Sequence, residues 1–182
     1  MRQVDASIAG KKVAMVGVSH RAVPLDLRER LHVDPQLARE IGSRLAGETG
    51  EAVVVSTCNR TELYLAATNV SAATALALDE LAGLAGLHAQ EVRSLVAVLG
   101  DDEAAAHLFA VAGGLESMAV GETQILGQVR DAHRRALEAR TSGPVSDRLF
   151  RQAVQTGRRI RSETSLLESS ASIPAAATRL AE

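Results

Sequence analysis

The sequence has very few aromatic residues and a single cysteine. Of its 182 residues two are phenylalanine, one is tyrosine and none is tryptophan, whereas 46% are hydrophobic. A core must therefore be built from Ala, Val, Leu and Ile, and we expect alanine-rich helices to dominate the fold. One cysteine excludes an intramolecular disulfide, and no basic N-terminal stretch leads into a long apolar run. We therefore expect a reducing, cytoplasmic location.

Long hydrophobic runs and cofactor-binding motifs are also missing. Apolar runs such as residues 53–55 are far too short to span a bilayer, so no membrane partner is expected. The sequence has no G-x-G-x-x-G after a predicted strand, no phosphate-binding G-x-x-x-x-G-K-[ST] loop and no zinc spacing among its histidines and cysteine. We expect this chain to bind neither a nucleotide cofactor nor a metal.

Charge is nearly balanced overall but unevenly distributed. The net charge is -2, yet residues 130–161 contain nine arginines against three acidic residues. The arginines are Arg130, Arg134, Arg135, Arg140, Arg148, Arg151, Arg158, Arg159 and Arg161. This pattern is typical either of a solvated helical face or of a surface that contacts phosphates.

The first part of the chain alternates between short apolar strands and helices. Strands are predicted over residues 12–18, 51–57, 61–66 and 95–99. Helices are predicted over 25–31, from Asp34-Pro35 to about residue 45 with a stop at Gly47, and over 71–85 with a stop at Gly86. The order strand, helix, strand, strand, helix, strand predicts an α+β fold with a ferredoxin-like subdomain over residues 1–103.

From residue 104 the pattern becomes helical. Apolar residues recur at three- and four-residue spacing over 104–118 and again over 125–136. Ser142-Gly143-Pro144 predicts a break, and Ser146 is a suitable N-cap for another long helix. Residues 104–165 are therefore predicted to form a helical subdomain.

The only cysteine, Cys58, falls in the tight connection between the second and third predicted strands. A lone cysteine is more often a small buried hydrophobe than a nucleophile. Here, however, Asn59 and Arg60 follow it, and a nearby guanidinium favours the nucleophilic thiolate. Thr57, Asn59 and Arg60 could also hydrogen-bond a small polar substrate, and Arg60 suits a carboxylate because it can donate two parallel hydrogen bonds.

A second polar group lies in the glycine-rich stretch "GLESMAVGETQILGQ". Since a glycine costs about 1 kcal/mol relative to alanine inside a helix, the stretch is not typical of a plain core helix. It indicates either polar capping of a helix break or a binding segment, and its candidate residues are Ser117, Glu122, Thr123, Gln124 and Gln128. His107, just before the apolar Leu108, is either a residue at the margin of a helix face or a functional group.

Four stretches together resemble the N-terminal catalytic domain of the glutamyl-tRNA reductase family. They are "VGVSHRAVPLDLRERL", "VVVSTCNRTELYL", "HLFAVAGGLESMAVGETQILGQV" and "GRRIRSET", and they follow the order found in the family. The combination of "STCNRTE" with "GLESMAVGETQILGQV" is highly specific.

The resemblance implies a role for each matching residue. Cys58 matches the nucleophile that attacks the ester between glutamate and the tRNA 3′ end and holds the glutamyl group as a thioester. His107 matches a histidine important for activity, in thiolate or transition-state assistance. The glutamate pocket is matched by Thr57, Asn59, Arg60, Ser117, Glu122, Thr123, Gln124 and Gln128.

The resemblance also implies partners. In the family, NADPH reduces the thioester to glutamate-1-semialdehyde for tetrapyrrole biosynthesis. The expected partners are glutamyl-tRNA, a second copy in the homodimer of the full-length enzyme, and the aminomutase that receives the aldehyde.

The chain departs from the family pattern after "RSET". The family continues through a glycine-containing link into an NADPH-binding domain and a dimerisation domain, whereas here Ser165-Leu166-Leu167 occupies the link. Residues 166–182 are interpreted as the start of that link, so NADPH is expected in the full-length enzyme and not on this chain. The chain is then either an excised catalytic domain or a stand-alone homologue that transfers or hydrolyses glutamyl groups. Two other functions stay open: a non-catalytic module that binds the glutamyl-tRNA acceptor end or a protein partner, and a ligand-sensing ferredoxin-like domain in which Cys58 is structural.

Overall fold

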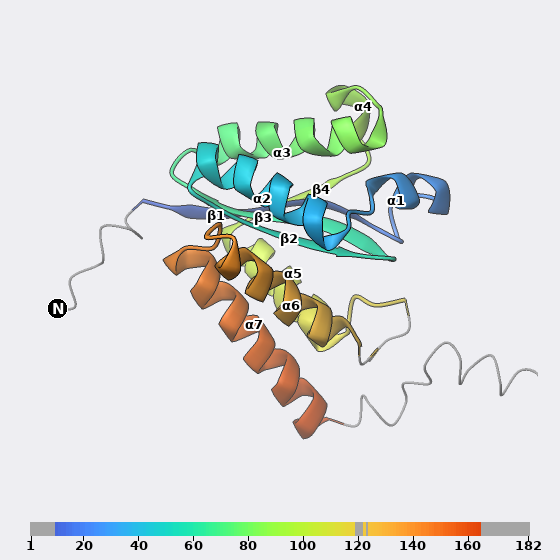
Figure 1. Ribbon diagram of the computed structural model, residues 1–182. Helices are drawn as coiled ribbons and strands as arrows, with labels where there is room; N and C mark the ends of the chain where they lie inside the picture. The colour runs from blue at the N-terminus through green and yellow to red at the C-terminus, as the bar shows by residue number, and fades with distance from the viewer. Residues whose placement is uncertain (1–9, 119–121, 123, 165–182) are drawn as a thin grey trace, which may run out of the picture.

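A four-stranded antiparallel sheet lies between two layers of helices (Figure 1). The computed structural model describes residues 10–118, 122 and 124–164. The strands are β1 (Lys12–Ser19), β2 (Glu51–Thr57), β3 (Arg60–Ala67) and β4 (Ala97–Gly100), in the spatial order β2-β3-β1-β4. Helices connect β1 to β2 and β3 to β4, while a hairpin connects β2 to β3, which is the ferredoxin-like arrangement. The predicted α+β class and order of elements are therefore confirmed.

One face of the sheet is covered by α1 (Leu25–Leu31), α2 (Pro35–Thr49), α3 (Val70–Ala85) and α4 (Ala89–Arg93). Their core joins Leu63 and Leu65 of the sheet to Ile41 and Leu81 of the helices. Burying each such side chain contributes about 1.5–3 kcal/mol. Asp34 caps α2 as its sequence position predicts, because its side chain accepts hydrogen bonds from the backbone N–H groups of Gln36 and Leu37.

Two details of this layer differ from the sequence prediction. Helix α2 does not stop at Gly47 but continues to Thr49, and the glycine that ends it is Gly50, with a φ of 110°. A residue with a side chain is strained at such a φ, whereas a Cβ at Gly47 would meet no atom within 4 Å, so nothing at that position requires a glycine. The short helix α4 was not predicted, since five residues are too few to show helical periodicity.

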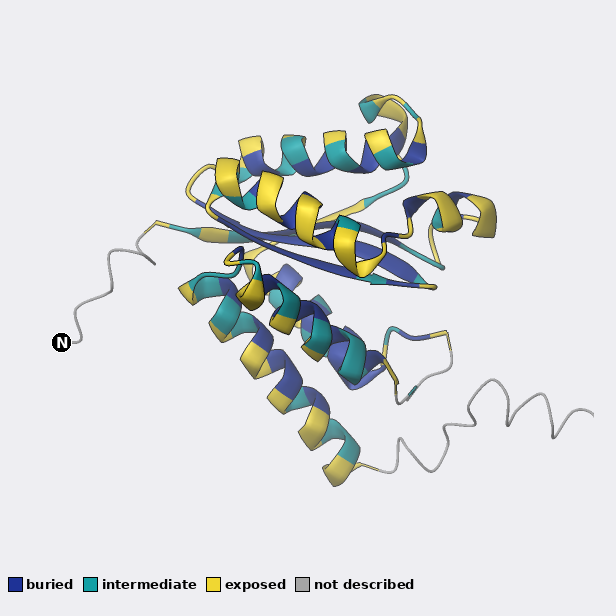
Figure 2. Cartoon of the chain, in the orientation of Figure 1, coloured by how far each residue is buried: buried dark blue, intermediate teal, exposed yellow. Residues whose placement is uncertain are grey.

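The other face is covered by α5 (Asp101–Gly113), α6 (Gln124–Glu138) and α7 (Pro144–Glu163). Their core contains Met15 and Tyr64 from the sheet and Leu108 and Phe150 from the helices. The Tyr64 and Phe150 rings meet edge to face with centroids 5.3 Å apart. With helices on both sides, β3 is buried along its whole length (Figure 2). Helix α5 begins at Asp101, so the expected boundary between the ferredoxin-like and helical subdomains, after residue 103, falls within the first turn of this helix.

Helix α7 is attached to the rest of the protein at both ends. At its start the carboxylate of Glu51, which is 1% exposed, accepts hydrogen bonds from the backbone N and Oγ of Ser146, each 2.8 Å long, and from Lys11 Nζ. Ser146 was expected to be the N-cap, but Gly143 occupies that position and Ser146 lies in the first turn. At the other end Arg161 Nη2 donates to the backbone oxygen of Glu122 over 2.9 Å.

None of the helices in the described part of the chain has both the length and the apolar character needed to cross a membrane.

Candidate functional site

Cys58 lies on the two-residue turn between β2 and β3. Thr57 pairs with Arg60 across the hairpin, leaving Cys58 and Asn59 as the turn residues. The turn is held from both sides: the Asn59 N–H donates to Thr57 Oγ1 over 3.1 Å, and the Asn59 carbonyl accepts from the His20 N–H over 2.8 Å. The cysteine is exposed, so the predicted turn position is confirmed and burial as a small hydrophobe is wrong for this residue.

A cleft of about 360 Å³ opens beside the thiol. Cys58 and Thr57 form one wall, and Gln128 and Arg135 of α6 form another. His32, which precedes α2, also contributes, with its Nδ1 3.3 Å from the Thr57 carbonyl oxygen. The volume lies in the range typical of small-molecule sites.

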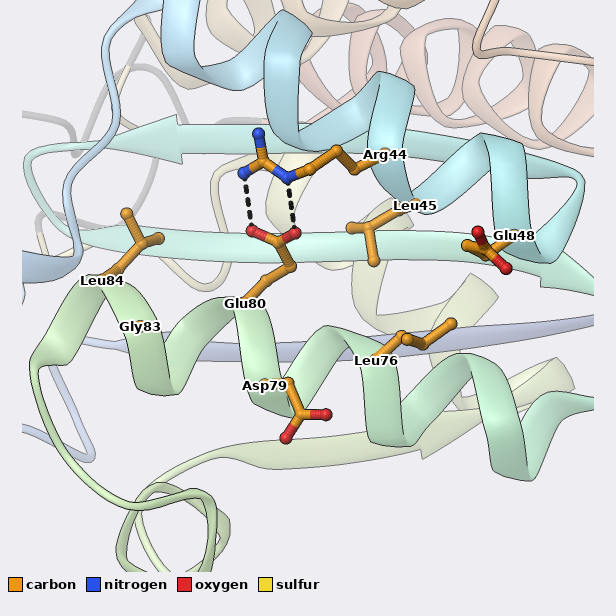
Figure 3. A pocket seen from close by; sticks show the side chains of 8 residues that line it. All are labelled: Arg44, Leu45, Glu48, Leu76, Asp79, Glu80, Gly83 and Leu84. Atoms are coloured by element: carbon orange, nitrogen blue, oxygen red, sulfur yellow. Dashed lines mark hydrogen bonds and ion pairs between the residues drawn. The ribbon is translucent and has the colours of Figure 1, made fainter.

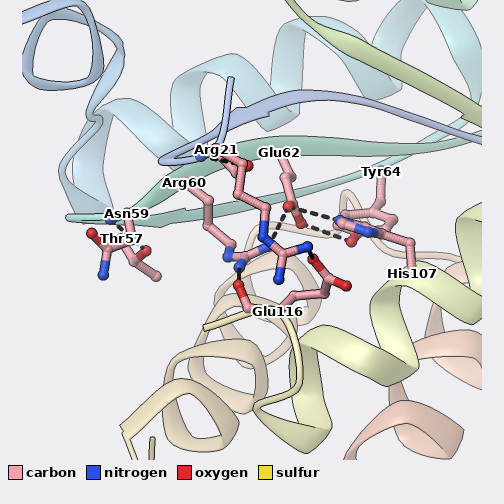
Figure 4. A network of polar contacts seen from close by, with 9 residues as sticks. Arg21, Thr57, Asn59, Arg60, Glu62, Tyr64, His107 and Glu116 are labelled. Atoms are coloured by element: carbon pink, nitrogen blue, oxygen red, sulfur yellow. Dashed lines mark hydrogen bonds and ion pairs between the residues drawn. The ribbon is translucent and has the colours of Figure 1, made fainter. Parts of the chain in front are cut away.

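Arg60 points away from the turn, to the face of the sheet covered by α5 and α6 (Figure 4). Its Nη1 donates to Glu62 Oε1 over 2.7 Å and its Nη2 donates to the backbone oxygen of Glu116 over 2.5 Å. The hydroxyl of Tyr64 donates to the other Glu62 oxygen over 2.8 Å. Because side chains alternate along a strand, these three residues of β3 share one face. The Arg60 and Glu62 side chains are each only 2% exposed, so the ion pair is fully desolvated.

His107 reaches the same carboxylate from α5, with Nε2 2.9 Å from Glu62 Oε1. Burial would raise the pKa of Glu62, but the hydrogen bond from His107 and the charge of Arg60 outweigh it and hold the pKa below its ordinary value. An ionised carboxylate can only accept, so His107 carries its hydrogen on Nε2. Burial and the negative charge of Glu62 raise the pKa of Tyr64 well above 10, so that hydroxyl is a donor as well.

A more voluminous groove than the cleft beside Cys58 lies elsewhere. It measures about 580 Å³ and runs between α2 and α3 on the opposite helix layer (Figure 3). Arg44 spans it and makes two 2.8 Å hydrogen bonds with the carboxylate of Glu80. None of the candidate residues lines this groove, so its size does not make it the candidate site.

Comparison with known proteins settles the family. A sequence model of the family described as "Glutamyl-tRNAGlu reductase, N-terminal domain" matches residues 16–164. The chain belongs to the glutamyl-tRNA reductase family.

Individual members of the glutamyl-tRNA reductase family match over almost the whole chain. The enzyme from Rubrobacter xylanophilus is 46% identical over 171 residues, which cover 93% of this chain and 40% of the relative. A Synechococcus relative is 40% identical over 172 residues, covering 93% and 39%. The solved structure of glutamyl-tRNA reductase from Methanopyrus kandleri matches with a TM-score of 0.73 and 33% identity, covering 93% and 39%. The chain therefore spans about 40% of the length of these glutamyl-tRNA reductases.

The candidate residues fall into two groups around the hairpin. Thr57, Cys58 and Gln128 line the cleft together. Arg60 and His107 meet at Glu62 instead.

The remaining candidates follow α5 in the chain. Ser117 is buried next to Glu116, whose carbonyl binds Arg60. Gln124 is exposed at the start of α6, and Glu122 is half-buried with its carbonyl bound by Arg161. Thr123 lies outside the described residues.

Sequence reasoning missed Glu62, Tyr64 and Glu116. A signal for Glu62 was present: the apolar positions of the predicted third strand alternate with Arg60, Glu62 and Tyr64, which therefore share the second face. A charged residue on a strand covered on both faces needs a partner, and Arg60 is the nearest one on that face. Glu116 gave no such signal, because it contacts Arg60 through its backbone oxygen.

The described residues do not form a nicotinamide site of the Rossmann type. Such sites lie at the carboxyl ends of parallel strands, whereas the strand pairs here are antiparallel. Within the same residues, no group of three His, Cys, Asp or Glu side chains is placed to hold a metal ion.

Proposed function

We propose that this chain performs the transfer step of glutamyl-tRNA reductase, in which Cys58 takes the glutamyl group from glutamyl-tRNA. The observation that carries the proposal is an exposed thiol on a tight turn, at the edge of a cleft, within the "STCNRTE" motif of the family. The thiolate sulfur bonds to the ester carbonyl carbon, the bond from that carbon to the ribose oxygen breaks, and the ribose oxygen takes a proton. The glutamyl group remains as a thioester.

The residues around Cys58 have distinct tasks in this proposal. Thr57, Asn59 and Gln128 hydrogen-bond the substrate beside the thiol. Arg60 is assigned the side-chain carboxylate of glutamate, and because its side chain is only 2% exposed, its contact with the Glu116 carbonyl must open for the carboxylate to reach it.

His107, fixed by Glu62, assists the thiolate or the transition state. The assigned pocket also includes Ser117, Glu122, Thr123 and Gln124. Glu62 acts through Arg60 and His107, so it is a positioning residue.

Reduction belongs to the longer members of the family, where NADPH supplies a hydride to the thioester and gives glutamate-1-semialdehyde, a precursor of tetrapyrroles. The antiparallel strands described here do not form a site of the Rossmann type for that cofactor. For this chain we therefore propose transfer without reduction, followed by slow release of glutamate to water. The homodimer and the aminomutase partner are likewise assigned to the longer enzyme.

Mass spectrometry after mixing the chain with glutamyl-tRNA tests the proposal. We expect one glutamyl adduct on Cys58 and none on the variant Cys58→Ser. The variant should fold normally, because the residue is exposed and the change in volume is small. An adduct that persists in Cys58→Ser, or the absence of any adduct on the parent chain, would overturn the assignment.

A non-catalytic module that binds RNA or a protein partner is the second candidate, supported by the exposed arginines of α6 and α7. Several of them are already paired: Arg134 with Asp131, Arg151 with Asp147 and Arg159 with Glu163. The free positive charge of this surface is therefore smaller than its sequence indicates.

Thiol alkylation at neutral pH and a salt titration of tRNA binding separate the two functions. A nucleophilic Cys58 reacts quickly. A phosphate-binding module without catalysis combines a slow thiol with an affinity that falls steeply as salt rises.

A further inference from the structure

Basic side chains from the turn after β1 and from α1 gather at the end of the sheet that carries Cys58. They come from "SHRAVPLDLRERL", part of a family motif to which no role has yet been given. The His20 N–H binds the Asn59 carbonyl of the cysteine turn over 2.8 Å. Arg21 Nη1 binds the Glu116 carboxylate over 2.5 Å, and the Glu116 carbonyl binds Arg60 (Figure 4). The motif therefore contacts both sides of the proposed glutamyl site.

The charges in this group are not all balanced. The carboxylate of Glu62 pairs with Arg60 and that of Glu116 with Arg21. The Nε of Arg28 and the Nδ1 of His20, by contrast, are buried without a hydrogen-bond partner among the described residues. A buried polar atom without a partner is costly, which points to a missing ligand.

The electrostatics agree with this geometry. Burial lowers the pKa of His20, and the positive charges of Arg60, Arg21 and Arg28 lower it further and outweigh the opposing negative charge of Glu116, so these guanidinium groups act on one small volume. The side of the turn that His20 occupies therefore attracts an anion.

We propose that His20, Arg21 and Arg28 form a subsite for the phosphate group that precedes the terminal adenosine of glutamyl-tRNA. The inference rests on the proposed function, because that function places the ester carbonyl at Cys58. Glutamate brings one free carboxylate, which Arg60 is assigned to bind. The next anion of the substrate is the phosphate, separated from the ester only by the terminal ribose. Arginine suits a phosphate because its planar guanidinium donates two hydrogen bonds at once.

Two small substrates test the subsite: glutamate esterified to the ribose of adenosine, and the same ester of adenosine 5′-monophosphate. The rate of glutamyl transfer to Cys58 is followed by mass spectrometry. We expect the phosphate-bearing ester to react faster, and Arg28→Gln to remove roughly 10- to 100-fold of its rate, the worth of one charge-assisted hydrogen bond. The adenosine ester should react equally with both proteins, and Arg28→Lys should restore part of the preference.

Arg30→Gln is the matched control, because it makes the same charge change on the same helix. The Arg30 side chain lies against Gly86 at the end of α3, so this variant should keep the full preference for the phosphate-bearing ester. Equal rates for the two esters on the parent chain, or an Arg28→Gln variant that slows both esters equally, would overturn the phosphate subsite. Failure of Cys58 to react with either ester and with glutamyl-tRNA would instead overturn the proposed function.

Discussion

Replacing Glu62 by glutamine would remove one buried negative charge from the side of the sheet that α5, α6 and α7 cover, while nearly keeping the volume of the side chain. The buried guanidinium of Arg60 would then lose its counter-ion, which lies 2.7 Å away and is as deeply buried as Arg60 itself. With about 4 Å between the charge centres and an effective dielectric constant of about 20, the lost attraction is roughly 4 kcal/mol. Breaking a buried pair by removing one partner typically costs about 3–5 kcal/mol, so we expect a loss of that size in the free energy of unfolding.

Urea denaturation of Glu62→Gln, Arg60→Gln and the double variant measures this loss as a double-mutant cycle. The double variant should lose clearly less stability than the sum of the two single variants, since neither charge is left alone. Glu48→Gln, an exposed change of the same kind on α2, should stay within about 0.5 kcal/mol of the parent chain. A loss below about 1 kcal/mol for Glu62→Gln, or additive single effects, would refute the view that the pair is desolvated and coupled.

The same carboxylate should give the stability a pH dependence. The pKa of Glu62 lies below its ordinary value of 4.5 in the folded chain, so the unfolded chain binds its proton first as the pH falls. The contribution is complete above about pH 4.5 and is lost as the pH falls through the folded-state pKa. Glu62→Gln should therefore flatten the acid limb of the stability curve, and an unchanged acid limb would contradict the assignment.

Three further outcomes are expected. Arg60→Lys should slow glutamyl loading of the thiol by an amount worth about 1–3 kcal/mol although the charge remains, because a lysine cannot bind a carboxylate bidentately; equal loading in the mass-spectrometric assay would reassign Arg60 to structure. Gly157→Ala should destabilise the chain in urea, since its Cβ would lie 2.6 Å from the backbone oxygen of Ala112. Gly127→Ala, whose Cβ would have no neighbour within 4 Å, should be neutral or stabilising by up to about 1 kcal/mol. Similar effects of the two substitutions would contradict the close packing of α5 on α7. With glutamyl-tRNA and NADPH, the chain should release glutamate but no glutamate-1-semialdehyde in an aldehyde assay, and robust aldehyde formation would reveal a nicotinamide site.

Much of the fold could be predicted because its elements carry local signals. The bounds of β2 match the predicted residues 51–57, and α3 ends at Ala85 before Gly86, as predicted. The predicted end of α2 was wrong because the same sequence signal, a glycine, occurs at two nearby positions. Gly47 and Gly50 are both glycines that could end α2. The helix ends at Gly50 because the chain adopts a positive φ there and not at Gly47, and the sequence alone does not show where that φ occurs.

The site was predictable to the extent that it lies on one hairpin. The position of Cys58 on a turn was predicted correctly, because only a few residues separate the two predicted strands on either side of it. The network around Glu62 was not predicted, because the partner His107 is 45 residues away in the sequence and meets it only when α5 packs on the sheet. Periodicity identifies the face that a residue occupies but not the neighbour it finds there.

Strand β2 and helix α7 are regular elements, so the length of each follows from its number of residues. The strand has seven residues, about 23 Å of chain, with Glu51 at one end and Cys58 just beyond the other. The first turn of α7 is hydrogen-bonded to Glu51, and the helix then runs for 20 residues, or about 30 Å. Near its other end, Arg161 donates a hydrogen bond to the backbone oxygen of Glu122. The contact between Arg161 and the Glu122 backbone therefore depends on the number of residues in α7. Inserting one residue into α7 would turn Arg161 by about 100° about the helix axis, so the exposed face of α7 should tolerate changes in composition far better than changes in length.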